Sequence, residues 1–164
     1  MIMLDRKSII QKSLLVVMIL SFFLITDVNA GSRTGLSTGA TVYVSIYSNV
    51  YSGPKSRSVN LDAMLSVRNT DPKFPITILA ADYYDSAGKL MRRHIKEPTE
   101  LKPLESMYTH IKEYDTSGGS GANFLVKWRS KNRVNKPIIE GIMTNTRSGL
   151  SFRCPGREIV EHPD

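Results

Sequence analysis

The sequence predicts an all-β protein, an antiparallel immunoglobulin-like β-sandwich of about seven or eight strands that follows a signal-peptide helix. Two observations lead to this fold class. From residue 38 onward, apolar and polar residues alternate in short segments, which is the period of a strand with one buried face. Turn-forming residues end these segments about every eight to twelve residues, and no window of about eleven residues after the signal peptide has a helical period.

The expected strands can be placed in order along the chain. In the first, residues 38–51, the side chains of Val42, Val44 and Ile46 lie on one face. The second covers residues 59–70 and ends at a proline-containing stretch, where the ladder of hydrogen bonds cannot continue. The later strands are expected at residues 76–85, 89–96, 107–114, 123–130, 137–146 and 149–154.

Two connections between the expected strands carry clear turn signals. Residues Asp85–Gly88 predict a hairpin turn in which Gly88 takes a positive φ. Residues Arg68–Pro72 predict a turn fixed by hydrogen bonds from the side chains of Asn69 and Asp71. This second turn is also a place where a ligand site would be sought.

Residues 1–30 have the three parts of a secretory signal peptide. Three Lys and Arg residues precede the apolar run 14–25, and Val28 and Ala30 form a small-x-small cleavage pattern. We expect cleavage after Ala30, which leaves residues 31–164 as one exported domain, periplasmic or extracellular. The apolar run is short for a bilayer span of about 20 residues. The alternative is an inner-membrane anchor formed by the uncleaved run 14–25.

The composition limits the partners of the exported domain. It keeps 19 of the 22 Lys and Arg residues and 13 of the 15 Asp and Glu residues, an excess of six positive charges. This excess suits an anionic envelope component or another envelope protein, and an exported chain is not expected to meet nucleic acid. The single cysteine, Cys154, excludes an internal disulfide and a cysteine-based zinc cluster. We expect it to be a part-buried residue, and we expect no cofactor.

The stretch between the fifth and sixth expected strands is rich in glycine and hydroxyl residues, and we call it the glycine loop (residues 115–123). We interpret it as a candidate recognition loop, because a simple strand connection rarely needs three glycines, each of which raises the entropy lost on ordering. Its candidate contact residues are Asp115, Ser117, Gly118, Gly119, Ser120, Gly121 and Asn123. The competing interpretation is a connection whose glycines serve only the backbone.

The glycine loop has features of three kinds of chemical site. A phosphate-binding P-loop needs a lysine after the glycines and then a helix, and the sequence has neither. A serine hydrolase using Ser120 is an alternative, although the following strand does not suit a nucleophile elbow and a base (His94 or His110) would have to come from elsewhere. A calcium loop over Asp115–Asn123 is the other alternative, with one carboxylate where several are usual.

Five segments carry a family resemblance: TVYVSIYSNVY, LSVRNTDPKFPITILAADYYDSAGKL, EPTELKPLES, DTSGGSGANFLVKW and PIIEGIM. In this order, over about residues 38–152, they resemble the bacterial exported family catalogued as domain of unknown function 3124, and DTSGGSGANF is the most specific part. The resemblance implies a small single-domain exported protein. It implies no activity, so no catalytic or metal-binding residues are carried over.

A row of basic residues follows the glycine loop. Lys127, Arg129, Lys131 and Arg133, here called the basic stripe, recur at every second position, opposite the apolar set that includes Trp128, which is expected in the core. We interpret the stripe as a solvated strand face that discourages edge-to-edge pairing, with a patch for an anionic partner as the alternative. With no complete catalytic motif, the sequence predicts a non-enzymatic binding or structural module of the cell envelope.

Overall fold

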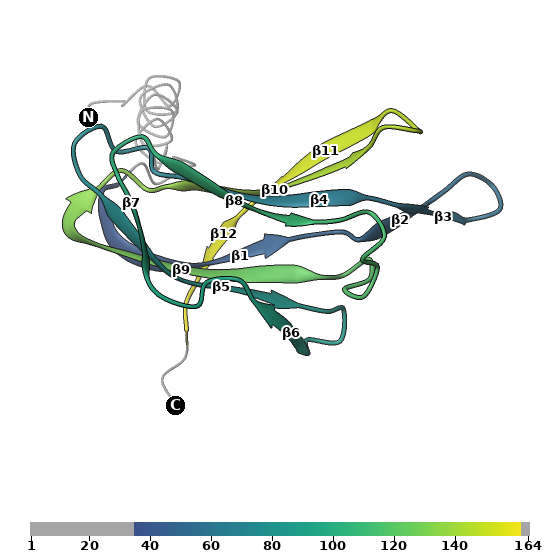
Figure 1. Ribbon diagram of the computed structural model, residues 1–164, viewed down its shortest axis with the longest axis horizontal. Helices are drawn as coiled ribbons and strands as arrows, with labels where there is room; N and C mark the ends of the chain where they lie inside the picture. Colours follow the sequence, from purple (N-terminus) through teal and green to yellow (C-terminus); the bar gives the residue numbers. More distant parts are fainter. Residues whose placement is uncertain (1–34, 162–164) are drawn as a thin grey trace, which may run out of the picture. The chain divides into compact units, whose positions relative to one another are not determined.

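The computed structural model describes residues 35–161, and these residues form twelve β-strands (Figure 1). The predicted signal peptide and its cleavage site lie outside the described residues. Within residues 35–161, the structure contains no helix long and apolar enough to cross a membrane. The prediction of an all-β fold is confirmed.

The strands form two antiparallel sheets and a separate hairpin. The larger sheet consists of β1 (Ser37–Ser45), β5 (Ile76–Tyr84), β6 (Leu90–Arg93), β7 (Thr99–Leu101), β9 (Asn123–Val134) and β12 (Arg157–Ile159). The smaller sheet consists of β4 (Asp62–Arg68), β8 (Ser106–Ile111), β10 (Ile138–Asn145) and β11 (Leu150–Pro155). The hairpin pairs β2 (Asn49–Ser52) with β3 (Arg57–Asn60).

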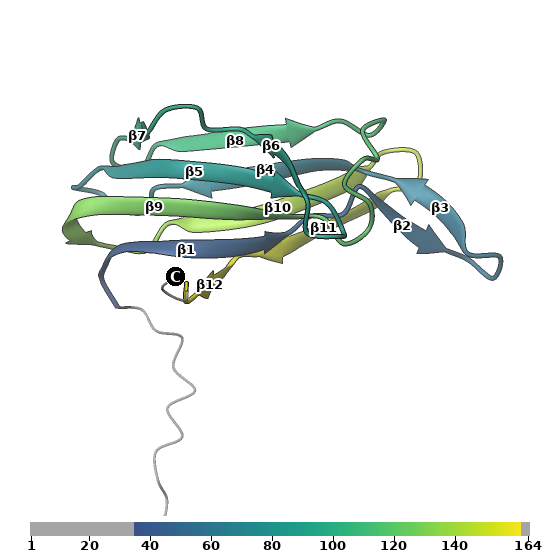
Figure 2. The same ribbon diagram turned by 90° about the horizontal axis from the view of Figure 1, so that it is seen from below.

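The order of strands places β9 and β4 inside their sheets. The larger sheet runs β12-β1-β9-β5-β6, with β7 pairing with the first residues of β5, and the smaller runs β11-β10-β4-β8. Figures 1 and 2 show β1, β9 and β5 side by side in one layer, with β8, β4 and β10 in the other. The outermost strands β6 and β8 are therefore edge strands of different sheets.

The core lies between the two sheets and is built from alternate residues of each strand. The predicted inward set of β1, Val42, Val44 and Ile46, is buried, and so is Trp128, which is 2% exposed. In the smaller sheet, every second residue of β4, together with Leu61 just before it, packs into the core in the same way. Its buried side chains there are Leu61, Ala63, Leu65 and Val67. Alternation thus identified the core correctly, because each sheet has one buried face.

Two features of the strands differ from the prediction. The first two expected strands are each split. After Ser45 the chain leaves β1 and its backbone bonds the glycine loop, with Ile46 N donating to Ala122 O and Ser48 N to Gly119 O. The second expected strand, residues 59–70, is divided between β3 and β4 at Leu61, whose N–H donates to Ser48 O. The short strands β7 and β12 were not predicted. Each has three residues, of which Leu101 alone is buried, so neither carries an alternation signal.

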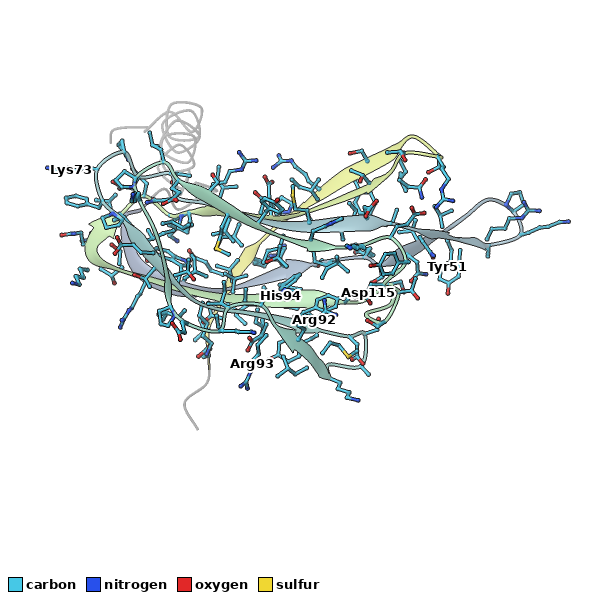
Figure 3. The ribbon with its side chains drawn as sticks, viewed as in Figure 1. Tyr51, Lys73, Arg92, Arg93, His94 and Asp115 are labelled. Carbon is cyan, nitrogen blue, oxygen red and sulfur yellow. The ribbon has the colours of Figure 1, made fainter. Side chains whose placement is uncertain are left out.

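The two turn predictions are confirmed. Gly88 has a φ of 79°, and its N–H donates to Asp85 O at 3.0 Å, which closes the β5–β6 hairpin. The Asn69 and Asp71 side chains fix the turn after β4, as described below. That turn and the glycine loop follow opposite ends of the paired strands β4 and β8. Figure 3 accordingly shows Lys73 and Asp115 far apart. We call the end near Lys73 the knot end, after the buried polar turn described below, and the end near Asp115 the glycine-loop end.

Candidate functional site

The glycine loop is held by hydrogen bonds from its own residues and from the β5–β6 hairpin. The Asp115 Oδ1 atom accepts bonds from the backbone N–H and the hydroxyl of Ser117, and Gly119 N donates to Thr116 O at 3.1 Å. Ser86, in the β5–β6 hairpin, bonds the loop at two residues. Its N–H and its hydroxyl both donate to Gly118 O at 2.9 Å, and its Oγ accepts from Gly121 N at 2.8 Å. The loop is therefore ordered within the chain itself.

The glycines of the loop are needed for close packing. A Cβ atom on Gly118 would lie 1.9 Å from the Tyr83 hydroxyl, and one on Gly119 would lie 2.7 Å from Ser86 Oγ. Gly119 also has a φ of 74°, which a side chain disfavours. Gly121 is less tightly confined, with Ser86 Oγ 3.2 Å from its would-be Cβ. The backbone interpretation thus accounts for the glycines, and Asn123 serves as the first residue of β9.

What remains available for recognition is a set of side chains. The amides of Ser117, Gly119 and Gly121 already donate within the chain, so a partner would meet few free N–H groups from these glycines. Exposed side chains surround the bonded backbone, namely Tyr114, Thr116, Ser117 and Ser120. A candidate contact surface therefore consists of hydroxyls and one tyrosine that is 77% exposed.

Asp115 is oriented toward a cation. Its side chain is mostly buried, and its Oδ2 lies 3.5 Å from a guanidinium nitrogen of Arg92, which comes from the edge strand β6. The hydrogen bond from the Ser117 hydroxyl, together with the charge of Arg92, lowers the pKa of Asp115 below its usual range. Within residues 35–161, no three His, Cys, Asp or Glu side chains gather as metal ligands would.

The residues of the hydrolase alternative lie in different surroundings. Ser120 is exposed on the loop, and in the described part of the chain it forms no hydrogen bond with His94 or His110. His110 Nε2 lies 2.9 Å from Asp62 Oδ1 on the smaller sheet. The ring of His94 packs against Phe124, with 5.4 Å between centroids, and its Nε2 is buried without a partner among the described residues. Burial, followed by the charge of Arg92, lowers the pKa of His94.

The basic stripe is exposed, but it lies apart from the glycine loop. Lys127 and Arg129 project from the middle of the larger sheet, where β9 is flanked by β1 and β5, so they cannot protect a sheet edge as predicted. At about 3.3 Å per residue, Arg129 is already roughly 20 Å from Asn123. Lys127 pairs with Glu161 at 2.8 Å. Lys131 and Arg133 follow in a stretch where the register with β1 shifts.

The turn after β4 forms a knot of buried polar groups. Asn69, 2% exposed, donates through Nδ2 to the carbonyls of Phe74, Leu101 and Lys102. Asp71, 5% exposed, accepts bonds from three backbone N–H groups, those of Lys73, Phe74 and Asn135. These bonds, that of Asn135 above all, lower the pKa of Asp71. Because every one of these bonds is internal, the turn is structural.

Sequence reasoning missed a cavity beside the glycine loop. It has a volume of about 210 Å³ and lies between the edge strands β6 and β8. Its lining residues are Arg92, His110, Lys112, Tyr114 and Asp115, and we call it the edge cavity. His110 and Lys112 are two residues apart in the sequence, which is a weak signal. Nothing in the sequence indicated that β6 would bring Arg92 to them, because the two strands belong to different sheets.

A second cavity opens at the same end, on the other side of Glu113. Its volume is about 370 Å³, and polar side chains line it, including Asn60, Asn145 and Arg147. Glu113 Oε1 accepts hydrogen bonds from Arg147 and Asn145, which holds this carboxylate in place.

Cys154 lies elsewhere, on β11, where it is part-buried as predicted, and burial raises the pKa of its thiol.

Comparisons with known proteins give one family and one solved structure. The family model described as "Protein of unknown function (DUF3124)" matches residues 39–159. The crystal structure of Thermotoga maritima 1070 aligns with 74% of this chain and 96% of its own, with a TM-score of 0.43 and 10% sequence identity. No curated protein matches the sequence.

Proposed function

The chain belongs to the family described as "Protein of unknown function (DUF3124)", and from that premise we propose that it is a non-enzymatic binding module of the cell envelope, with the glycine loop as its recognition site. One observation carries the proposal. The loop backbone is bonded internally and clamped by Ser86, while Tyr114, Thr116 and Ser120 stay exposed around it. Ordered loops that display side chains suit recognition.

Preorganisation is the physical reason for giving this loop the binding role. A flexible loop loses conformational freedom when it binds, which weakens binding by about 0.5–1.5 kcal/mol for each immobilised side chain. In this protein the loop backbone is already ordered before binding, so much of that loss of conformational freedom does not occur when a partner binds. The cavity of about 210 Å³ is lined in part by Asp115, the first residue of the loop, and that of about 370 Å³ is lined in part by Glu113, two residues before it. The partner we propose is an anionic envelope component or another envelope protein.

The non-enzymatic part of the proposal rests on the separation of reactive groups. Ser120, His94 and His110 form no hydrogen bond with one another in residues 35–161. The Asp115 carboxylate, which a calcium loop would need, faces Ser117 and Arg92 instead. A hydrolase or a calcium site would therefore require these side chains to rearrange.

The envelope location rests on the signal-like features of residues 1–30. If the proposal holds, mass spectrometry of the protein from its native host will find an N-terminus at Gly31. A chain that retains Met1 in a membrane fraction would instead support an anchor at residues 14–25.

We also propose that the sandwich is immunoglobulin-like in a broad sense. Strands β4 and β8 pair as B and E do in an immunoglobulin domain, and β5 and β9 pair as C and F do. The strands in the places of A and G have exchanged sheets: β1 joins the sheet of β5 and β9, and β10 joins that of β4 and β8. An experimental structure of the domain tests this assignment directly.

Site-specific cross-linking in the native host tests the recognition role. A photo-reactive residue is placed at Ser120 in the loop, and a matched control replaces Ser106, an exposed serine at the knot end. We expect a covalent adduct, resolved by mass, from position 120 and none from position 106. Adducts of equal yield at both positions, or none at 120, would contradict the loop as the recognition site.

A further inference from the structure

We propose that the edge cavity binds a phosphate or sulfate group, which identifies the chemical class that the binding module recognises. This inference takes the proposed binding role as its premise. The cavity lies where the edge strand of one sheet faces the edge strand of the other, so side chains from both sheets converge on it. In Figure 3, Arg92 lies next to Asp115, whereas Arg93 is directed away from them.

The charge of the edge cavity favours an anion. Arg92 and Lys112 each bring one positive charge to the cavity lining, and Asp115 brings one negative charge. His110 donates through Nε2 to the Asp62 carboxylate at 2.9 Å, which holds the ring in position, and the other nitrogen of the neutral ring is an acceptor. The five lining residues therefore carry one net positive charge, which an anion would balance, and the Asp62 carboxylate lies behind the His110 ring, outside the lining.

The two cations of the edge cavity have N–H donors that no group of the described chain uses. The bond from Arg92 to Asp115 is 3.5 Å long, beyond the 2.7–2.9 Å typical of a strong charge-assisted bond. A guanidinium carries five N–H donors, so most of those of Arg92 are free of this contact. Lys112 Nζ lies over the ring of Tyr114, 5.6 Å from its centroid, and forms no ion pair within residues 35–161. Both cations are placed to receive an anion.

The size and the lining of the edge cavity suit one charged group. About 210 Å³ is below the range of about 300–1,000 Å³ typical of small-molecule sites, but it is ample for one charged group. Tetrahedral oxyanions accept several hydrogen bonds from different directions, and arginine is well suited to them. The donors of the lining are the Arg92 guanidinium on β6 and, in the segment after β8, the Lys112 ammonium and the Tyr114 hydroxyl. The anionic group of a larger ligand would thus enter the cavity while the rest of the ligand contacts the glycine loop.

Titration of the purified full-length chain with inorganic phosphate, followed by two-dimensional NMR at constant ionic strength, tests the proposal. We expect saturable shifts at Arg92, Lys112 and Tyr114, and the same residues shifted by sulfate but not by chloride. The double variant Arg92→Gln/Lys112→Gln should bind phosphate at least tenfold more weakly. The matched control Arg93→Gln/Lys89→Gln removes the same amount of charge from the β5–β6 hairpin, at positions outside the cavity lining, and should retain binding within twofold.

Each outcome is decisive for the cavity. Equal losses in both double variants would mean a general charge effect, and shifts that do not saturate would mean that no site exists; either result overturns the proposal. If the Arg92 double variant does not fold, Lys112→Gln alone carries the test, because the contact of Lys112 in this part of the chain is with Tyr114. These results come from the purified chain, so they are independent of the cross-linking result on the loop.

Vesicles distinguish two sources of the anionic group. Co-sedimentation with phosphatidylglycerol vesicles but not with phosphatidylcholine vesicles, lost in the Arg92→Gln/Lys112→Gln variant, would assign the site to a lipid phosphate. Saturable phosphate binding without vesicle binding would assign it to a soluble phosphorylated or sulfated ligand.

Discussion

At the knot end of the sandwich, polar side chains tie the connections together, whereas at the glycine-loop end the absence of side chains lets the connections fit together. Asn69 and Asp71 are buried and direct their hydrogen bonds to backbone groups of three connections. Gly118 is buried too, but it contributes space: the Tyr83 ring occupies the place that a Cβ would take.

The difference bears on where function can reside. A polar side chain that is bonded on all sides inside the protein has nothing left to offer a ligand. At the glycine-loop end, the close packing of the glycines and the hydrogen bonds of Ser86 supply the order, so the exposed side chains of Tyr114, Thr116 and Ser120 remain available. The edge cavity and the exposed hydroxyls occur there for this reason.

The largest effect on stability is expected from a substitution that disrupts the packing of the glycine-loop end. Gly118→Ala should lower the free energy of unfolding by about 3 kcal/mol, because its Cβ would overlap the Tyr83 hydroxyl and the ring cannot move without disturbing the core. Urea denaturation measures the change. The control is Gly35→Ala, which has no atom within 4 Å of its would-be Cβ and should change stability by less than about 0.5 kcal/mol. Equal stability of the two variants would refute the packing argument.

The next largest effect on stability is expected at the knot end. Asn69→Ala should lower the free energy of unfolding by about 2 kcal/mol, since three carbonyls lose their donor and two of those bonds span more than thirty residues. The exposed Asn132→Ala serves as its control and should be nearly neutral. A loss at Asn69 no larger than that at Asn132 would show that water replaces the missing donor.

A smaller effect separates order from stability at the glycine-loop end. Ser86→Ala removes the hydroxyl that bonds Gly118 and Gly121, and should lower the free energy of unfolding by about 1 kcal/mol. The amide of Gly121 should exchange with solvent faster, as measured by hydrogen exchange, while the amides of the knot end should keep their rates. Unchanged exchange at Gly121 would show that other contacts hold the loop.

The smallest effect concerns pH. Because the folded state lowers the pKa of His94 below the usual 6.5, it binds this proton less readily than the unfolded state does. The contribution of neutral His94 to stability is therefore complete above about pH 6.5 and decreases as the pH falls below that value. Urea midpoints at pH 7.5 and 5.5 should differ more for the wild type than for His94→Gln. A wild type no more acid-sensitive than the variant would show that His94 titrates normally.

The sequence was sufficient for the parts of this fold that alternate. Val42, Val44 and Trp128 were placed in the core because strands with one buried face have a period of two. The strands β7 and β12 were out of reach, since three mostly exposed residues have no pattern and form a strand only because a neighbour offers its edge.

The candidate site was predictable only where it is local. The turn bonds of Asn69 and Asp71 span a few residues and were foreseen, but their longer-range bonds to Lys102 and Asn135 were not. The loop glycines were conspicuous, yet their reason lies in Tyr83 and Ser86, which only the folded chain brings near. For the same reason, the meeting of Arg92 with Lys112 depends on how the sheets face each other, which no single segment encodes.

The pairing of β1 with β12 has a consequence for the order in which this protein can fold. Thr41 bonds Glu161, a contact that spans 120 residues, and its strand also pairs with β9 late in the chain. A growing chain therefore cannot complete the larger sheet until almost all of residues 35–161 have been synthesised. Such long-range pairings make folding slow.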